Sequence, residues 1–420
     1  MGVGHSKVSP CLRPSDGHEH QHAPTHSKNA QPLRLDGHVS GVMSLCTFEG
    51  DTDELSSQPW LVSAGNAVMR VWNADTCQCL RVLHGHSSAV RSVCMLEGGL
   101  QMVSCGDDGI VCLWDLATGS RLRVFKGHLG IVWGVCALFS ENDTTPVLSL
   151  ALQSARGRSH TAPAHDVTWH EDGVARNAHG VPVAGGPRRR RLSVESERRR
   201  LGTTRFIVSC GDDKAVKIWN VETGENTQTM NGHSSYVLAV CALGGASGDP
   251  ASFASAGDDR TVRIWSVDEA KPVKTLVGHT GTINAICALG DRASLGRDNK
   301  MASASDDGTV RIWNLNDSQC IKVLRGHWNQ VFAVCSLVNP NGTRLVTGGA
   351  DKSVRVWDAD TGECTWVLDG HSSNIISLCA LDGGTRIASG SLDRSVRVWK
   401  LREKGRPMGS PQADGPESWY

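Results

Sequence analysis

The stretch SCGDDKAVKIW, residues 209–219, combines side chains that could do chemistry. Its adjacent carboxylates, Asp212 and Asp213, are groups typical of a metal site or a general acid. Ser209 precedes them, and with His128 it would complete a Ser-His-Asp set of the kind that hydrolases use. Both interpretations require the stretch to be unique in the chain.

The stretch is not unique. Between residues 37 and 371 a Gly-His pair occurs seven times, and each of these pairs is followed by a tryptophan that ends an alternating run. From each of the first six tryptophans to the next of these histidines the distance is 14 residues. The histidines are His38, His86, His128, His233, His279, His327 and His371, and the tryptophans are Trp72, Trp114, Trp219, Trp265, Trp313, Trp357 and Trp399. A fixed period predicts a repeat architecture of seven units.

Within a unit, the short runs have the pattern of strands. Runs such as VRSVCML and RLRVF alternate in polarity, and Gly, Asp, Asn and Ser separate them. The chain resembles the WD-repeat β-propeller family over roughly residues 31–401, with the Trp-Asp pair literal at Trp114-Asp115 and Trp357-Asp358. The resemblance implies an all-β fold of seven four-stranded antiparallel blades around a channel, without catalytic activity.

The resemblance also explains the acids. In units two to seven the second acid precedes the tryptophan by six residues, and a Ser or Thr precedes it by ten. In the family these groups, with the histidine, form one buried hydrogen-bond chain inside each blade. The residues expected to form it in units three to five are His128, Ser209, Asp213 and Trp219; His233, Ser255, Asp259 and Trp265; and His279, Ser303, Asp307 and Trp313. Seven copies, each with a tryptophan, favour a structural role over hydrolysis.

The first unit departs from the pattern, because SAGNAVMRVW is one residue shorter and has Asn66 in place of the acid. We therefore expect its hydrogen-bond chain to be incomplete or rearranged. The last unit ends at Trp399 without an outer strand, whereas PLRLDGH, residues 32–38, resembles an outer-strand sequence. We expect residues 31–36 to pair beside the strand ending at Trp399 and close the ring.

Seven cysteines lie eight residues after the Gly-His histidines, and this regularity indicates a small packing residue in each blade. They are Cys46, Cys94, Cys136, Cys241, Cys287, Cys335 and Cys379. We expect neither disulfides nor a metal site from them, and no cofactor is implied.

Two tails and an insert flank or interrupt the predicted propeller. We expect disorder in residues 1–30, in residues 402–420 and in an Arg-rich insert of unit three at about 141–203. Within GGPRRRRLSVESERRR, Ser193 follows a basophilic-kinase pattern; the alternatives are a solvated spacer and a nuclear-import or nucleic-acid patch. At the N-terminus, MGVGHSK fits the myristoylation pattern on Gly2, with Cys11 or the arginines as a second membrane signal; the alternative is a chance match.

The 43 basic and 43 acidic residues cancel, so no overall field attracts nucleic acid or anionic membrane. No apolar run suits a transmembrane helix, and the polar start does not suit a secretory signal. We expect a cytoplasmic protein, membrane-associated if Gly2 carries a lipid; a nuclear location is the alternative.

In relatives, the residue five after the Gly-His histidine lines the channel mouth. Here that set is Met43, Arg91, Trp133, Leu238, Asn284, Phe332 and Ile376, and Tyr236 and Trp328 are expected beside it. Two aromatics and an Arg among apolar residues indicate a surface that binds other proteins; the alternative is that these side chains plug the channel. The sequence therefore predicts a non-catalytic protein-interaction scaffold, with no small-molecule substrate. An RNA- or chromatin-associated subunit that uses the Arg-rich insert is the alternative.

Overall fold

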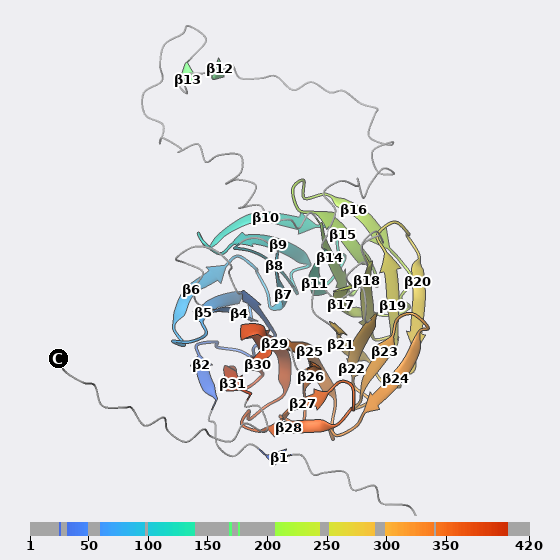
Figure 1. Cartoon of the computed structure of the whole chain (residues 1–420). Coiled ribbons are helices and arrows are strands. Elements are labelled where there is room, and N and C mark those ends of the chain that lie inside the picture. The colour runs from blue at the N-terminus through green and yellow to red at the C-terminus, as the bar shows by residue number, and fades with distance from the viewer. Residues whose placement is uncertain are drawn as a thin grey trace, which may run out of the picture.

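The computed structural model of the chain is a ring of seven β-sheets around a central channel (Figure 1). The structure describes residues 25–26, 32–48, 59–96, 100–138, 168–169, 175–176, 206–243, 252–289, 299–339 and 342–401. The predicted fold class, an all-β seven-bladed propeller of four-stranded antiparallel blades, is confirmed. The described residues contain no helix with the length and apolar character needed to cross a lipid bilayer.

In blades 1 to 6 four antiparallel strands follow one another in sequence from the channel outward. Blade 1 comprises β3 (Ser44–Phe48), β4 (Trp60–Gly65), β5 (Val68–Asn73) and β6 (Cys79–His84), and blade 2 comprises β7 (Val90–Met95), β8 (Gln101–Gly106), β9 (Ile110–Asp115) and β10 (Ser120–Lys126). Blade 3 comprises β11 (Val132–Leu138), β14 (Phe206–Gly211), β15 (Val216–Asn220) and β16 (Asn226–Met230), and blade 4 comprises β17 (Val237–Leu243), β18 (Ser252–Gly257), β19 (Thr261–Ser266) and β20 (Pro272–Val277). Blade 5 comprises β21 (Ile283–Leu289), β22 (Lys300–Ser305), β23 (Val310–Asn314) and β24 (Gln319–Leu324), and blade 6 comprises β25 (Val331–Asn339), β26 (Gly342–Gly349), β27 (Val354–Asp358) and β28 (Cys364–Leu368).

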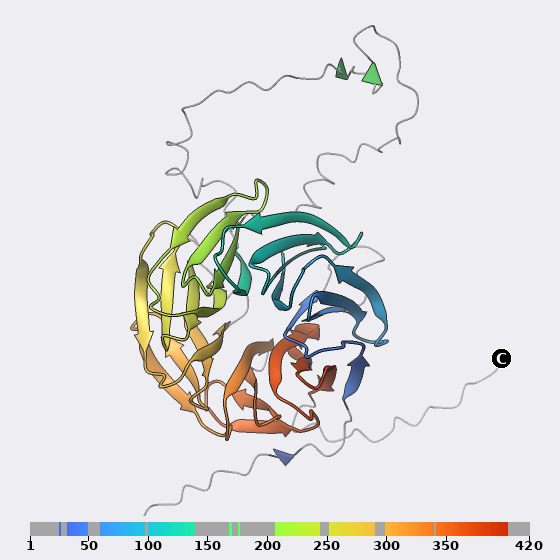
Figure 2. The same cartoon turned by 180° about the vertical axis from the view of Figure 1, so that it is seen from behind.

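Blade 7 is built from both ends of the described chain. Its inner strands are β29 (Ile375–Leu381), β30 (Arg386–Ser391) and β31 (Ser395–Lys400), and the short 3-10 helix η1 (Asp382–Gly384) joins the first two. Its outer strand is β2 (Leu33–Asp36), which pairs antiparallel with β31 so that Leu33 faces Val398 and Asp36 faces Ser395. Figure 2 shows the blue β2 beside the red blade from behind. The expected closure by residues 31–36 is confirmed, and it gives blade 7 four strands.

Two further pairings lie in segments where the sequence predicts no structure. Strand β1 (Thr25–His26) pairs in parallel with β28 and extends blade 6 to five strands. Strands β12 (Thr168–Trp169) and β13 (Ala175–Arg176) pair with each other inside the insert between β11 and β14. The rest of the two predicted tails and of the insert at 141–203 lies outside the described residues.

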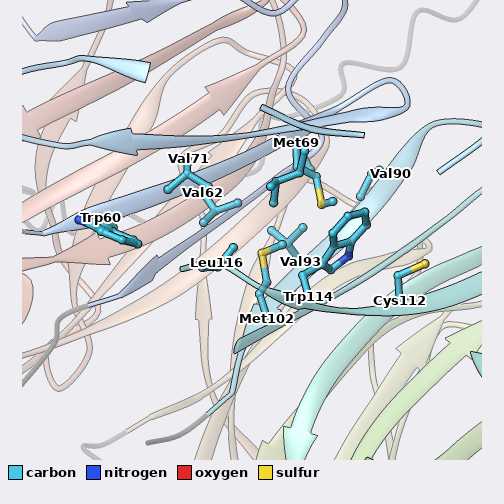
Figure 3. Close-up of a cluster of buried hydrophobic side chains, with 12 residues drawn as sticks. Trp60, Val62, Met69, Val71, Val90, Val93, Met102, Cys112, Trp114 and Leu116 are labelled. Carbon is cyan, nitrogen blue, oxygen red and sulfur yellow. The ribbon is translucent and has the colours of Figure 1, made fainter. Parts of the chain in front are cut away.

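The hydrophobic core lies between neighbouring blades, since each sheet buries both faces. In the cluster between blades 1 and 2, Val62 and Met69 from one sheet pack with Val90 and Trp114 from the next (Figure 3). Leu35 of β2 packs into the equivalent seam between blades 7 and 1 and is 2% exposed. Ring closure is therefore stabilised by apolar burial as well as by the strand pairing.

Packing against the tryptophan explains the glycine of each Gly-His pair. A Cβ atom at Gly278 would lie 3.0 Å from Cη2 of Trp313, and one at Gly326 would lie 2.9 Å from Cη2 of Trp357. The indole thus occupies the space that any larger residue would need.

Candidate functional site

The predicted hydrogen-bond chain can be followed atom by atom in blade 3. His128 Nδ1 lies 2.9 Å from Asp213 Oδ2, and His128 Nε2 lies 2.7 Å from Ser209 Oγ. The same hydroxyl accepts a 2.8 Å hydrogen bond from Trp219 Nε1. Equivalent bonds of 2.7–2.8 Å join the sets in blades 4 and 5, which are His233, Ser255, Asp259 and Trp265, and His279, Ser303, Asp307 and Trp313. The structure thus brings together every group that the sequence assigned to these chains.

This connectivity matches a Ser-His-Asp hydrolase, but the environment does not. Ser209, Ser255 and Ser303 are each 0% exposed, so their hydroxyls are closed to a substrate. Each hydroxyl also accepts an indole N–H, which occupies one of its two lone pairs and holds it inside the sheet. The groups are arranged to satisfy one another inside a sheet.

The protonation states fit a relay from indole to carboxylate. Burial lowers the pKa of His279, and the hydrogen bond with Asp307 only partly offsets this effect. A neutral imidazole donates from Nδ1 to Asp307 and accepts the Ser303 hydroxyl at Nε2. Burial by itself would raise the pKa of Asp307, but hydrogen bonds from Thr309, His279 and the Thr280 backbone lower it overall to about 2. Each polar atom of this hydrogen-bond chain thereby has a hydrogen-bond partner, and no positive charge is buried.

Blade 1 keeps only part of this chain. His38 Nε2 lies 2.7 Å from Ser63 Oγ, and Trp72 Nε1 donates to the same oxygen. Among the described residues no carboxylate faces His38, and burial followed by the nearby Arg70 lowers the pKa of His38 to about 4. Asn66 adopts a left-handed φ of 52° in the shortened turn. The acid that the sequence lacks is therefore not supplied by another part of the described chain.

The seven residues predicted at the channel mouth line one cavity of about 600 Å³. They are Met43, Arg91, Trp133, Leu238, Asn284, Phe332 and Ile376, all half-buried. In blades 2 to 7 the mouth residue sits at a β-bulge of the innermost strand, such as that between Val132 and Gly134 in β11. A bulge re-aims one side chain without breaking the sheet, and here it turns that side chain into the channel.

The mouth residues of blades 2 and 3 are held in one continuous set of contacts. Arg91 makes two hydrogen bonds to Asp107, of 2.5 and 2.8 Å. Its guanidinium lies 4.6 Å from the ring centroid of Trp133, and Trp133 Nε1 donates to Asp212 at 2.5 Å. Both large side chains are therefore preorganised, which lowers the entropy that binding would cost.

The carboxylates in these contacts are functional candidates that the sequence reasoning missed. Asp107 and Asp212 are the first acids of the adjacent pairs, whose second acids belong to the buried chains. In blade 5 Asp306 accepts a 2.7 Å hydrogen bond from Asn284, and in blade 4 Asp258 accepts from Ser235 and from Thr282 of the next blade. The signal in the sequence was the pair of adjacent acids. The second acid of each pair belongs to the buried hydrogen-bond chain, and the first acid makes hydrogen bonds at the channel mouth.

Tyr236 and Trp328 do not line the cavity. They lie on the loops that enter β17 and β25, on the face where the channel mouth opens, and are 49% and 74% exposed. Leu129 occupies the loop before β11 and is 88% exposed. The cavity is therefore accompanied by exposed apolar side chains on the same face.

The periodic cysteines occupy one position of the innermost strands, from Cys46 in β3 to Cys379 in β29. Burial raises the pKa of six of these seven thiols, that of Cys335 to about 12, so they are protonated at neutral pH. Within the described part of the chain, no group of three or more His, Cys, Asp or Glu side chains is placed to hold a metal ion. Gly2, Cys11 and Ser193 lie outside the described residues.

Comparison with known families agrees with this architecture. The model of the WD40 repeat (WD domain, G-beta repeat) matches residues 77–115, 202–220, 224–266, 270–314, 318–358 and 362–400. The chain belongs to the WD40-repeat family. WD40 propellers are generally non-catalytic scaffolds. The matched ranges leave out the first unit, whose buried chain lacks its acid.

Individual relatives match only in part. TOPLESS-related protein 4 and Protein TOPLESS of Arabidopsis thaliana are 29% and 28% identical over 106 and 109 residues, which cover 21% and 22% of this chain and 9% and 10% of those proteins. Nuclear distribution protein PAC1-2 of Uncinocarpus reesii is 38% identical over 68 residues, 15% of each chain. The chain thus spans about a tenth of the length of the TOPLESS proteins that it matches.

Proposed function

We propose that this WD40 propeller is a non-catalytic scaffold that holds segments of partner proteins at the mouth of its channel. The observation that carries the proposal is the mouth itself: seven half-buried side chains, among them Trp133 and Phe332, surround one cavity of about 600 Å³. Aromatic and Arg side chains in a partly desolvated pocket are typical of the anchors of protein interfaces. The closed Ser hydroxyls of the blades argue against hydrolysis as the function.

The test is capture of native partners from cells by the full chain and by a Trp133→Ala, Phe332→Ala double variant. We expect the double variant to lose the partners, because both anchors of the mouth are removed, and to keep its circular dichroism and melting temperature. Val273→Ala with Ile321→Ala is the matched control, since these apolar residues are exposed on the outer strands β20 and β24. Unchanged capture by the mouth variant would reject the site.

The alternative of an RNA- or chromatin-associated subunit rests on seven arginines within residues 188–200. A titration of RNA binding with salt separates the two functions, since phosphate contacts weaken steeply as salt rises. Binding of RNA that falls with salt and is lost when these arginines are replaced by Gln would favour the alternative.

Membrane tethering through Gly2 is a separate part of the proposal. A single myristoyl chain binds membrane only weakly, so Cys11 or the arginines would supply the second attachment. The intact mass of the protein purified from its own cells measures the acylation directly. An unmodified Gly2 would remove tethering and leave the scaffold function in place.

A further inference from the structure

The rim of the channel mouth differs between its two halves. Blades 2, 3, 4 and 5 each begin the turn between their second and third strands with a carboxylate, namely Asp107, Asp212, Asp258 and Asp306. The equivalent residues of blades 6 and 7 are Ala350 and Leu392, and blade 1 has no acid in this turn. The difference concerns only the first acid of each pair. The second acid, which is bonded to the histidine of its blade, is present in all six of blades 2 to 7.

Three neighbouring carboxylates of this acidic arc lack a cationic partner within the described part of the chain. Arg91 neutralises Asp107, whereas Asp212, Asp258 and Asp306 form no ion pair there. Their contacts are neutral hydrogen-bond donors, which are Trp133, Ser235, Thr282 and Asn284. Such donors fix the direction of a carboxylate without adding a positive charge.

The exposed member of the arc is Asp258. The hydrogen bonds from Ser235 and Thr282 lower the pKa of Asp258, so this carboxylate is ionised at neutral pH. The cations of the same turns, such as Lys214 and Arg260, come two residues later, on the side of the third strand. Arg260 forms no ion pair with Asp258, but its positive charge also lowers the pKa of Asp258.

In the opposite half of the mouth the cavity lining is apolar. Met43, Phe332 and Ile376 supply its cavity lining in blades 1, 6 and 7. Leu392 stands on the rim above them and is 40% exposed. A ligand that enters the mouth thus meets carboxylates beside blades 3 to 5 and an apolar cavity lining beside blades 1, 6 and 7.

We propose that the occupant of this mouth is a linear peptide segment of a partner protein that carries a Lys or Arg beside apolar side chains. The basic group lies over the arc of Asp212, Asp258 and Asp306, and the apolar side chains enter the cavity beside Phe332, Ile376 and Met43. Acidic segments are repelled by the arc, so the arc sets specificity more than total affinity. The inference rests on the proposed scaffold function and adds the chemistry of the partner.

The test uses fluorescence anisotropy with three short labelled peptides of alternating sequence: arginine and leucine, glutamine and leucine, and glutamate and leucine. We expect the full chain to bind the arginine peptide most tightly and the glutamate peptide least. Replacing the acids, Asp258→Asn with Asp306→Asn, should weaken the arginine peptide by about three- to tenfold and leave the glutamine peptide unchanged. The same loss should follow from raised salt, since these charges lie at the rim.

The matched control is Glu222→Gln with Glu269→Gln, which removes two exposed carboxylates from the turns on the opposite face. Equal binding of all three peptides, or equal effects of the two double variants, would overturn the proposed chemistry. One outcome is that capture of native partners is lost when Trp133 and Phe332 are changed to Ala, yet is unchanged by Asp258→Asn with Asp306→Asn and by raised salt. In that case the inference about a basic partner is wrong, and the scaffold function stands. If the arginine peptide binds only after Arg188, Arg189, Arg190 and Arg191 are changed to Gln, the Arg-rich segment of this chain occupies the mouth, and the proposal that its occupant belongs to a partner protein is wrong.

Discussion

The hydroxyl at the centre of each buried chain can be tested most cleanly in blade 6, where it belongs to a threonine. Thr347 is 0% exposed, and its Oγ1 lies 2.7 Å from His327 Nε2 and 2.8 Å from Trp357 Nε1. Thr347→Val keeps the shape and the strand preference of the side chain and replaces the hydroxyl by a methyl group. The indole N–H and the imidazole nitrogen then lose their shared partner inside the sheet.

An unsatisfied buried polar group costs about 1–3 kcal/mol, so the two groups together predict a loss of about 2–6 kcal/mol in the free energy of unfolding. Thr347→Ser is the control, because it keeps both hydrogen bonds and removes one methyl group at a cost of about 1 kcal/mol. Urea denaturation followed by circular dichroism, with melting temperatures beside it, measures the difference between the two variants.

The expected order of stability is wild type, then Thr347→Ser, then Thr347→Val. A valine variant as stable as the serine variant would refute the reasoning, because the hydroxyl would then contribute shape alone. It would also reopen the question of why the same hydroxyl occurs in every blade.

Three further predictions concern the ring and its blades. Leu35→Ala should lower the free energy of unfolding by about 2–5 kcal/mol, because it opens a cavity in the seam that closes the ring; urea denaturation checks this, and a loss below about 1 kcal/mol would contradict it. Gly278→Ala should lower the melting temperature, since its Cβ would lie 3.0 Å from the Trp313 ring, and an unchanged value would show that the indole can move aside at no cost. Burial lowers the pKa of His38 to about 4 and lowers that of His279, so unfolding takes up protons below the ordinary histidine pKa of about 6.5. The melting temperature should therefore fall between pH 7 and pH 5 at constant ionic strength, and a value that holds or rises over that range would contradict neutral buried imidazoles.

Much of the fold could be predicted because the residue spacings within each repeat depend on the local structure of one blade. The spacing from Ser209 to Asp213 to Trp219 lies within one hairpin of one blade, where backbone geometry leaves few arrangements. The closing strand was also predictable, since residues 32–38 repeat an outer-strand sequence that the last unit lacks.

The positions of the mouth residues followed from family resemblance, but their setting did not. The β-bulge at Trp133 cannot be predicted from the alternation of polar and apolar residues. A bulge changes the direction in which a side chain points, and the residue types do not reveal this change. The partner of Trp133 was likewise hidden, since Asp212 stands 79 residues away in the sequence.

The sequence by itself determined the number of blades and the members of each buried hydrogen-bond chain, because these depend on spacings within a repeat. It also determined the closure of the ring, because residues 32–38 supply the outer-strand sequence that the last unit lacks. The tertiary structure alone decided what the first acids do. Asp258 meets Thr282 of the next blade, and Arg91 of blade 2 stacks on Trp133 of blade 3. Contacts between blades depend on how each sheet is rotated against its neighbour, and the packing of all seven sheets sets that rotation.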